Sequence, residues 1–382
     1  MRVVIVSRGI PSDRYKLQGI FEYDQAKALA KYTDNEIFFV ALDLRSVRRW
    51  RKWGTHEYYK DGVHVISVNV PLGRVPDRLL DRIAIRKLKR VFSRISRSGK
   101  IDIIHGHFIE NGYYSLEAAK FSKIPVVVTE HRSDMNKKDL SQRFFDLGER
   151  TYHRADQVIA VSSALGKMIK KNFDVDVETI PNIVDLNDFE YNENAMRSRD
   201  IISVGSLSEN KNFADLIRAF AIAFPSEQRK LIIVGSGEQK HNLEELAEKT
   251  GIRDRVKFMG TLSRCEISEE MDKAQFFALT TKSETFGVVF IEALAKGLPV
   301  LATRCGGPED FVNSRNGVLV GKGSLEEIVR GLKYLDENIE EFDRREIADD
   351  VEKSVAGEVV AKQINQLYLT TVKKRSGNGK NN

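Results

Sequence analysis

Short runs of Val, Ile, Leu and Phe recur along the chain, separated by longer stretches in which apolar residues return every three to four positions. The short runs do not alternate with polar residues, which is typical of strands buried on both faces of a parallel sheet. The longer stretches predict amphipathic helices. The expected strands cover 3–6, 37–40, 101–104, 126–129 and 158–161 in a first series, and 201–204, 231–234, 256–258, 276–279 and 300–302 in a second.

A polar stretch, 185–198, separates the two series. With 382 residues, the chain is longer than a single hydrophobic core usually supports. We therefore predict an α/β protein with two doubly wound Rossmann-like domains facing a central cleft, a first domain at 1–185 and a second at 186–356. A helix at 357–372 is expected to pack back towards the first domain, and 373–382 to form a disordered tail.

Composition narrows the class of protein. Hydrophobic residues make up 41% and charged residues 30%, which excludes a disordered chain. No apolar run approaches the length of about 18 residues that a membrane span needs, and the apolar run after Arg2 is too short for a signal-peptide core. Cys265 and Cys305 are the only cysteines, so a disulfide framework is excluded and a cytoplasmic location is expected.

The positive charge is concentrated in the first half. Residues 1–190 hold 33 Lys and Arg against 25 Asp and Glu, whereas the second half holds 28 against 30. The expected helix at 76–97 carries an arginine at every fourth position beside an apolar stripe, which predicts docking on an anionic membrane surface. The segment 48–53 adds cations and two tryptophans. The arginines in this row are Arg78, Arg82, Arg86, Arg90 and Arg94.

Two other interpretations of this charge remain. Each segment has an alternative as a solvated surface. Nucleic-acid binding is the weaker interpretation, because no stacking platform or known binding motif accompanies the charge. We expect an anionic membrane surface and no nucleic acid as the partner.

The densest chemical signal lies between Lys282 and Pro299. An expected strand ends near 279, a loop carries Glu284 and Gly287, and a helix is expected to start at about Val288. A helix N-terminus after a glycine-bearing loop offers N–H groups and a positive dipole end to a phosphate. Glu292, one turn into that helix, is placed to accept hydrogen bonds from a sugar hydroxyl, and Glu284 from a second sugar. The alternative is a surface loop with solvated carboxylates.

Two further loops follow expected strands. Lys211 lies in the loop after 201–204, where phosphates gather in parallel sheets. The loop after 231–234 carries Gly235 and Gly237 but lacks the third glycine of a dinucleotide fingerprint, which excludes NAD binding. We interpret these two glycines as structural.

Together these motifs resemble the nucleotide-sugar half of the retaining GT-B glycosyltransferases of group 1, glycosyltransferase family 4. The resemblance continues more weakly into the first half. The matching positions in the second half are Val204-Gly205 with Lys211, Ile233–Gly237, Val256–Gly260, Glu284 with Glu292, Gly297–Val300 and Gly306–Glu309. Those in the first half are Gly19, Asp102–His107, Thr129–His131, Val161-Ser162 and Ile180–Asn182.

The resemblance implies a role for each matching residue. Lys211 would neutralise the donor diphosphate, and Glu284 would hold the donor sugar together with the backbone of Phe286 and Gly287. Glu292 would bind the nucleotide ribose. The implied catalytic residues are His131, Lys211 and Glu284, and the other implied donor-binding positions are Gly19, Gly205, Ser206 and Val288.

One position departs from the family. Many relatives carry Arg where this chain has Ser206. One phosphate-directed cation is therefore missing or is supplied elsewhere.

We expect neither a metal nor a cofactor, because a lysine and a helix dipole can stabilise the departing diphosphate. Asp174 and Asp176 imitate a metal-binding pair, yet they belong to a charged surface turn. His105 and His107 share one face of an expected strand but lack a third ligand. We expect these two histidines to line the cleft near the acceptor.

The resulting prediction is a retaining glycosyltransferase, peripherally attached to the inner, cytoplasmic face of a membrane. Its donor would be a nucleotide-sugar, with UDP favoured and GDP possible. The acceptor would be a lipid-linked sugar or saccharide in capsule, exopolysaccharide or lipopolysaccharide assembly. The alternatives are a nucleotide-sugar epimerase or phosphorylase of the same architecture, and a non-catalytic sugar-nucleotide-binding protein at the membrane.

Overall fold

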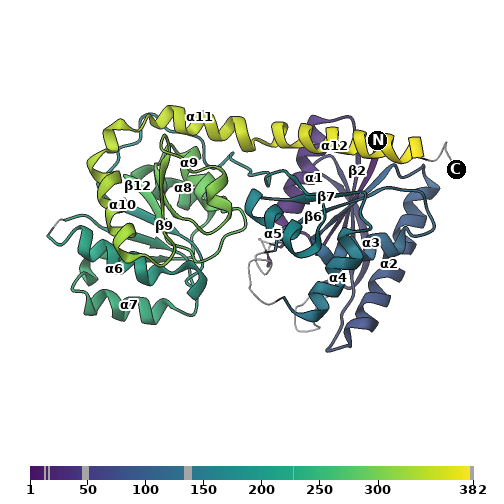
Figure 1. The fold of residues 1–382 in the computed structure, drawn as a ribbon, viewed down its shortest axis with the longest axis horizontal. Helices are drawn as coiled ribbons and strands as arrows, with labels where there is room; N and C mark the ends of the chain where they lie inside the picture. The colour runs from purple at the N-terminus through teal and green to yellow at the C-terminus, as the bar shows by residue number, and fades with distance from the viewer. Residues whose placement is uncertain (13, 16–17, 45–50, 133–139, 227, 379–382) are drawn as a thin grey trace. The chain divides into compact units, whose positions relative to one another are not determined.

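The computed structural model describes residues 1–382 except 13, 16–17, 45–50, 133–139, 227 and 379–382. It divides into two compact units, which Figure 1 shows as ribbons. Unit 1 comprises Met1–Ile183 and Gly357–Asn382, and unit 2 comprises Val184–Ala356. Each unit is a Rossmann-like α/β domain built on its own sheet.

Unit 1 contains an eight-stranded sheet in the order β3-β4-β2-β1-β5-β6-β7-β8. All neighbours are parallel except the edge strand β3, which pairs antiparallel with β4. The strands are β1 (Arg2–Ser7), β2 (Glu36–Asp43), β3 (Gly54–Lys60), β4 (Val63–Asn69), β5 (Ile103–His107), β6 (Val126–Glu130), β7 (Gln157–Ala160) and β8 (Glu178–Thr179). The helices are α1 (Ile20–Tyr32), α2 (Asp77–Arg97), α3 (Phe108–Ala118), α4 (Gln142–Tyr152), α5 (Ser163–Phe173) and α12 (Gly357–Asn378).

The hairpin of β3 and β4 is an element that the sequence pattern missed. β3 is mostly exposed, so its residues carry no buried run. Asp61 and Gly62 connect the two strands, both with positive φ (53° and 78°). An Asp-Gly pair with this backbone is the typical two-residue hairpin turn, and it was the available signal.

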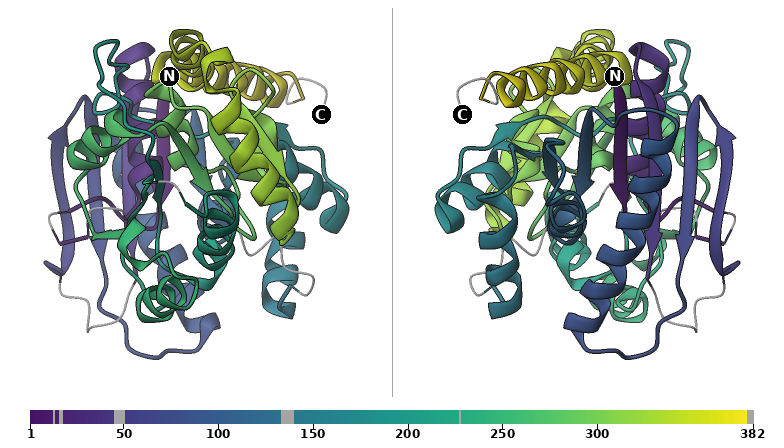
Figure 2. Two further views of the ribbon diagram at one scale, coloured as in Figure 1. Left: turned by 90° about the vertical axis from the view of Figure 1, so that its left-hand side faces the viewer. Right: turned by 90° about the vertical axis from the view of Figure 1, so that its right-hand side faces the viewer.

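The helix α12 returns to unit 1 after the chain has passed through unit 2. It packs against α1 (Figures 1 and 2) and buries Val360, Ile364 and Tyr368 in the hydrophobic core of unit 1. The prediction of a disordered tail from 373 is wrong for 373–378, which continue the helix. Lys and Arg are good helix formers, and Arg375 also pairs with Asp156 at 3.0 Å.

Unit 2 contains a six-stranded parallel sheet in the order β11-β10-β9-β12-β13-β14. The strand order reverses between β9 and β12, which makes this position the topological switch point. The strands are β9 (Ile201–Val204), β10 (Leu231–Val234), β11 (Val256–Gly260), β12 (Phe276–Leu279), β13 (Val300–Thr303) and β14 (Gly317–Val320). The helices are α6 (Phe213–Ala223), α7 (Lys240–Lys249), α8 (Arg264–Lys273), α9 (Val288–Ala295), α10 (Leu325–Glu337) and α11 (Arg344–Val355).

Candidate functional site

The switch point of unit 2 brings together two motifs that lie far apart in the sequence. Lys211 follows β9 and Glu284 follows β12, and these strands are neighbours in the sheet. The Nζ of Lys211 lies 2.5 Å from Oε2 of Glu284, and both side chains are mostly buried. A cation and a carboxylate therefore meet at the edge of the sheet where parallel α/β proteins bind ligands.

Local hydrogen bonds hold the two loops in register. Asn210 donates from its side chain to the carbonyl of Ser283 at 3.0 Å, and its own carbonyl accepts from the N–H of Lys282 at 2.7 Å. Asn212 has φ 52°, a left-handed conformation that ends the short turn carrying Lys211 and allows α6 to begin. The position of Lys211 is thus fixed by the backbone on both sides of the ion pair.

The loop after β12 leads directly into the N-terminus of α9. Gly287 precedes the helix with φ 95°, and a Cβ at this position would lie 2.9 Å from the Phe290 ring. Phe286 is buried, and Val288 is the first helical residue. The first N–H groups of a helix have no intrahelical acceptor, so α9 presents donors and its positive dipole end beside Glu284.

The glycines of the other loops allow the loops to approach one another. A Cβ at Gly235 would lie 1.9 Å from the carbonyl oxygen of Gly205, and one at Gly237 would lie 2.4 Å from that of Leu207. Because a side chain would clash with the neighbouring backbone, both positions need glycine for structural reasons. Ser206 lies exposed between these contacts and shares a hydrogen bond with Ser208 at 3.2 Å.

Glu292 lies on α9 and is 8% exposed. Its Oε1 accepts a hydrogen bond from Nη1 of Arg264 at 3.0 Å. Burial raises the pKa of Glu292 to about 7, while Arg264 lowers that pKa and Asp188 raises it. The sequence motifs do not include Arg264. The available signal was an arginine directly after the helix-capping Ser263, where the helix dipole disfavours a cation.

In unit 1 the three candidate histidines form a stack. His105 and His107 lie on β5, and their rings are 4.5 Å apart between centroids. The ring of His107 is 5.1 Å from that of His131, which follows β6, and His107 Nδ1 and His131 Nε2 share a hydrogen bond at 2.8 Å. His105 bonds Thr129 Oγ1 at 2.7 Å and the Tyr368 hydroxyl of α12 at 2.6 Å.

The prediction that His105 and His107 line a cleft near the acceptor is wrong. Both side chains are completely buried. β5 is an interior strand of a sheet covered on both faces, so alternate positions on it point into packed layers rather than to solvent. His107 instead shares a hydrogen bond with His131, and His105 stacks on His107.

Glu130 fixes the backbone at His131 and was also missed. Its Oε1 accepts hydrogen bonds from the N–H groups of His131 and Arg132, each at 2.9 Å. Its Oε2 accepts from the N–H of Ile109 at 3.1 Å and from the hydroxyl of Tyr152 at 2.8 Å. A carboxylate that ends the apolar strand β6 was the signal, because such a buried group needs several donors.

Desolvation keeps the imidazole of His131 neutral, although the residue is only partly buried. Desolvation, with a contribution from the guanidinium of Arg8, lowers the pKa of His131 to about 3. That guanidinium lies 3.3 Å from the centroid of the Phe108 ring, which in turn contacts His131. His131 is therefore suited to hydrogen bonding and packing rather than to proton transfer at neutral pH.

Gly19 is the left-handed residue that caps α1, with φ 66°. A Cβ there would lie 2.2 Å from the carbonyl oxygen of Gly9. The backbone at Gly19 therefore packs directly against that of Gly9 and requires glycine at this position.

Asp174 and Asp176 are exposed and both pair with Lys170, at 3.2 and 3.0 Å. In the described part of the chain, no group of three or more His, Cys, Asp or Glu side chains is arranged to hold a metal ion. Among the described helices, none is both long and apolar enough to cross a membrane.

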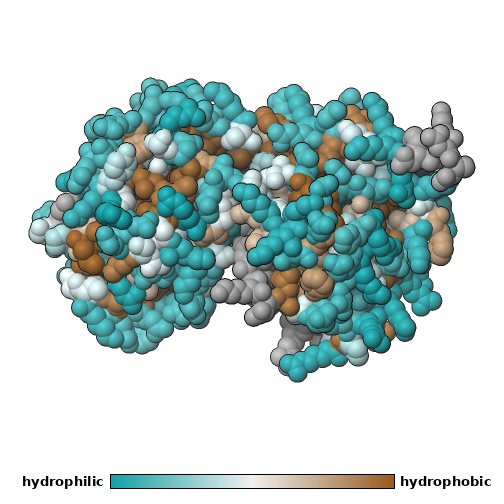
Figure 3. All heavy atoms as spheres, viewed as in Figure 1, coloured by the Kyte–Doolittle hydropathy of each residue, from teal (hydrophilic) through white to brown (hydrophobic). Residues whose placement is uncertain are grey.

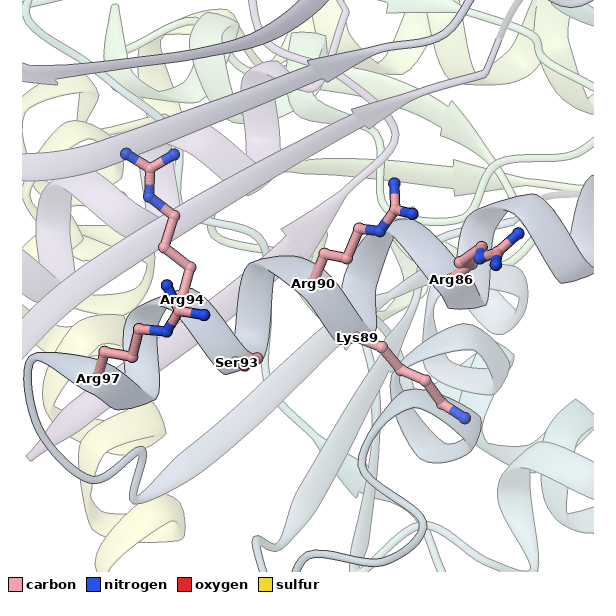
Figure 4. Close-up of a pocket in the computed structure, with 6 residues that line it drawn as sticks. All are labelled: Arg86, Lys89, Arg90, Ser93, Arg94 and Arg97. Carbon is pink, nitrogen blue, oxygen red and sulfur yellow. The ribbon is translucent and has the colours of Figure 1, made fainter.

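The predicted arginine row lies on α2. Arg82, Arg86 and Arg90 are exposed, and none of them forms an ion pair with another described residue. Arg94 is also exposed but pairs with Glu57 at 2.8 Å. Figure 4 shows basic side chains from successive turns of α2 lining a surface hollow, and hydrophilic residues predominate over this part of unit 1 in Figure 3.

The second basic segment, 48–53, lies partly outside the described residues, which exclude 45–50. Arg51 pairs with Asp43 and lies 4.6 Å from the centroid of the Tyr15 ring. This arginine is therefore occupied within unit 1, whereas Trp53 is 59% exposed.

Comparisons with known proteins match both units. The family described as glycosyl transferases group 1 matches residues 185–348, and Glycosyltransferase Family 4 matches 23–188. A putative teichuronic acid biosynthesis glycosyltransferase of Bacillus subtilis is 24% identical over 98% of this chain and 99% of its own length. An alpha-monoglucosyldiacylglycerol synthase of Acholeplasma laidlawii is 24% identical over 79% of this chain and 85% of its own.

Solved structures match the whole chain as well. The Anabaena protein HepE in complex with UDP has a TM-score of 0.73 and 18% identity, covering 97% of this chain and 99% of that one. The Glycosyltransferase Family 4 match covers most of unit 1, and the group 1 match covers most of unit 2. The chain belongs to the group 1 glycosyltransferases, glycosyltransferase family 4, and has their GT-B fold.

Proposed function

We propose that this glycosyltransferase moves a sugar from a UDP-sugar to a hydroxyl of a lipid-linked or saccharide acceptor, with retention of anomeric configuration and without a metal. The carrying observation is the meeting of Lys211 and Glu284 beside the N-terminus of α9. This arrangement offers a cation and helix N–H groups to a diphosphate, and a carboxylate to the adjacent sugar.

Donor binding breaks the ion pair between Lys211 and Glu284. Lys211 then pairs with the diphosphate, and Glu284 accepts hydrogen bonds from hydroxyls of the transferred sugar. Glu292 accepts hydrogen bonds from the ribose. Because Lys211 and Glu284 follow β9 and β12 and Glu292 lies on α9, the donor spans the switch point with its phosphates at the helix dipole.

The reaction proceeds by attack on the face from which the nucleotide leaves. The acceptor oxygen bonds to the anomeric carbon as the bond from that carbon to the β-phosphate oxygen breaks. The acceptor's proton passes to the departing phosphate, so no protein base is needed. Negative charge grows on that phosphate, and Lys211 with the dipole of α9 stabilises it.

Unit 1 contributes the acceptor side. His131 approaches the transferred sugar as a neutral hydrogen-bonding group, held by His107 and by the backbone bonds to Glu130. We assign Gly19 to the binding of the donor diphosphate. These assignments follow the family resemblance of the two positions.

The similar proteins guide the substrate classes. The HepE structure contains UDP, which favours a UDP-sugar donor. One relative is named for a glucosyl-diacylglycerol and another for teichuronic acid, which favours a lipid or saccharide acceptor in cell-surface polysaccharide assembly. We propose that the enzyme meets such an acceptor at the inner, cytoplasmic face of a membrane.

We further propose that α2 attaches the enzyme peripherally to anionic lipid. Arg82, Arg86 and Arg90 are exposed cations without ion-pair partners among the described residues. Such side chains are attracted to acidic headgroups by about 1 kcal/mol each.

Calorimetric titration with UDP-, GDP- and ADP-glucose tests the donor site. We expect the UDP-sugar to bind at least about tenfold more tightly than the other two. Glu292→Ala should weaken it by about 1–3 kcal/mol, because charged hydrogen bonds to the ribose are lost. Equal affinity for all three sugars, or unchanged affinity in the variant, would contradict the assignment.

A further inference from the structure

Arg264 is held at four points, although it is partly exposed. Its Nε donates to Asp188 Oδ2 at 3.1 Å, its Nη1 to Glu292 Oε1 at 3.0 Å and its Nη2 to the carbonyl of Asp185. The guanidinium also lies 4.9 Å from the centroid of the buried Phe189 ring. A long flexible side chain fixed in this way acts as a rigid group.

The position of Arg264 conflicts with helix electrostatics. It is the first residue of α8, where the dipole favours an anion and disfavours a cation. The capping box of Ser263 and Glu266 already satisfies this helix end. An arginine in such a place has a reason outside the helix, and functional sites are where local rules are commonly broken.

Glu292 supplies that reason. Among the described residues, the hydrogen bond to Arg264 is the one bond of its carboxylate, and it engages Oε1 alone. Oε2 remains for a ligand. A nearly buried carboxyl group without this partner would favour its neutral form.

We propose that Arg264 is the positioning residue of the nucleotide site, which holds Oε1 of Glu292 and favours the charged carboxylate so that Oε2 accepts a hydrogen bond from a ribose hydroxyl. The ligand class is the ribose of a nucleoside diphosphate. This inference rests on the proposed role of Glu292 in the donor site. It adds a residue that the sequence motifs do not contain.

Arg264 also joins Glu292 to the segment where the chain enters unit 2. Asp185 and Asp188 lie between the start of that unit at Val184 and the strand β9. The orientation of Glu292 thus depends on contacts to this segment as well as on α9.

The charges around Glu292 set the expected pH dependence. Arg264 of α8 lowers its pKa and Asp188 of the entering segment raises it. α11 packs on α9, but its Arg344 donates to the carbonyls of Gln275 and Gly297. Removing Arg264 should move the titration to higher pH, and removing the charge of Asp188 should move it to lower pH.

The test measures UDP affinity of the full chain by calorimetry from about pH 5.5 to about pH 9.5, with variants Arg264→Ala, Arg264→Lys and Asp188→Asn. We expect Arg264→Ala to raise the pH midpoint of the UDP-affinity profile by about one unit. It should also weaken UDP binding about tenfold near neutral pH. Affinity should recover at high pH. Arg264→Lys should restore most of the wild-type profile, and Asp188→Asn should shift the midpoint downwards.

Arg315→Ala is the matched control, because Arg315 also pairs with two carboxylates of unit 2, Glu346 and Asp350, and does not touch Glu292. It should leave the profile unchanged. If Arg264→Ala unfolds the protein, Asp188→Asn still tests the charge dependence, because it should move the midpoint of UDP binding to lower pH. An unmoved midpoint in folded Arg264→Ala, or in Asp188→Asn if Arg264→Ala does not fold, overturns the proposal.

Failure of the ribose role has a separate signature. The carboxyl carbon of Glu292, followed by NMR in the ligand-free protein, should titrate at higher pH in Arg264→Ala whether or not UDP uses Glu292. If that shift occurs but Glu292→Ala binds UDP normally, the ribose assignment fails. If the carboxyl titration does not move, the positioning role of Arg264 fails.

Discussion

Lys211 and Glu284, 73 residues apart in the sequence, form an ion pair with an Nζ–Oε2 distance of 2.5 Å. The two side chains neutralise one another, so neither is an unpaired charge at the carboxyl edge of the unit 2 sheet. Donor binding replaces one partner by a diphosphate and the other by sugar hydroxyls. The ion pair therefore holds both side chains in place for the donor before the donor binds.

Replacing Lys211 by Ala should reduce kcat by at least about 100-fold while the protein remains folded, because the cation acts most strongly on the charge of the departing phosphate. Steady-state kinetics at saturating donor measure this. Lys282→Ala is the control, since Lys282 pairs with Glu209 at 2.9 Å on an exposed part of the neighbouring loop. Comparable rates for the two variants would refute the role of Lys211.

Unit 1 should lose stability in mild acid. Burial lowers the pKa of His105 and His131 to about 3 and that of His107 well below its usual value, whereas all three titrate near 6.5 when unfolded. Their folded-state pKa is depressed, so the unfolded chain takes up protons as the pH falls below about 6.5. Each histidine then costs at most about 1.4 kcal/mol per pH unit.

Urea unfolding at several pH values measures that slope. His107→Gln should make the loss of stability with falling pH shallower. His241→Gln is the control, because His241 is exposed on α7 and pairs with Glu245. Identical slopes in both variants and the wild type would show that the buried histidines do not take part.

Turnover should survive removal of divalent cations. Lys211 and the α9 dipole supply the positive potential at the leaving phosphate, so we expect full activity after treatment with EDTA. Initial rates with and without the chelator, followed by added Mg²⁺ or Mn²⁺, make the comparison. Complete loss of activity that a metal restores would contradict metal independence.

Binding to vesicles tests the basic face of α2. The triple variant Arg82→Gln, Arg86→Gln and Arg90→Gln should bind phosphatidylglycerol vesicles about 100-fold more weakly, at about 1 kcal/mol per arginine. Binding of the wild type should fall as salt rises, because the Debye length shrinks. Cosedimentation measures both effects.

A matched triple variant, Lys240→Gln, Lys249→Gln and Arg330→Gln, removes the same charge from unit 2, where each of these residues already pairs with a glutamate. It should bind the vesicles as the wild type does. Equal binding of both triple variants would leave α2 as a solvated face.

The sequence pattern predicted where Lys211, Glu284 and Glu292 lie in unit 2, because each part of that arrangement is local. Strand β12 is a continuous apolar run and β9 is apolar except for Ser203, and Lys211, Glu284 and Glu292 follow these strands at the carboxyl edge. The parallel α/β pattern alone brings such loops together. The turns at Asn212 and Gly287, both with positive φ, then lead each loop into its following helix with Lys211 and Glu284 side by side.

The parts that were missed depend on distant contacts. Burial of His105 is completed by Tyr368, 263 positions away, which no local pattern connects to it. Arg264 and Glu130 act through partners on other elements, so their residue types had no periodic signal. The β3–β4 hairpin was missed because an exposed edge strand lacks the apolar run that marks the buried ones.

Release of UDP from a UDP-sugar, measured with and without an acceptor, tests the central claim most directly. We predict release that depends on a lipid-linked or saccharide acceptor, with the sugar recovered on the acceptor in the anomeric configuration of the donor and with the rate abolished in Lys211→Ala. An epimerase or phosphorylase would alter the sugar without transferring it to this acceptor, and a binding protein would release none. UDP release at the same rate without acceptor, or an inverted product, would contradict the account.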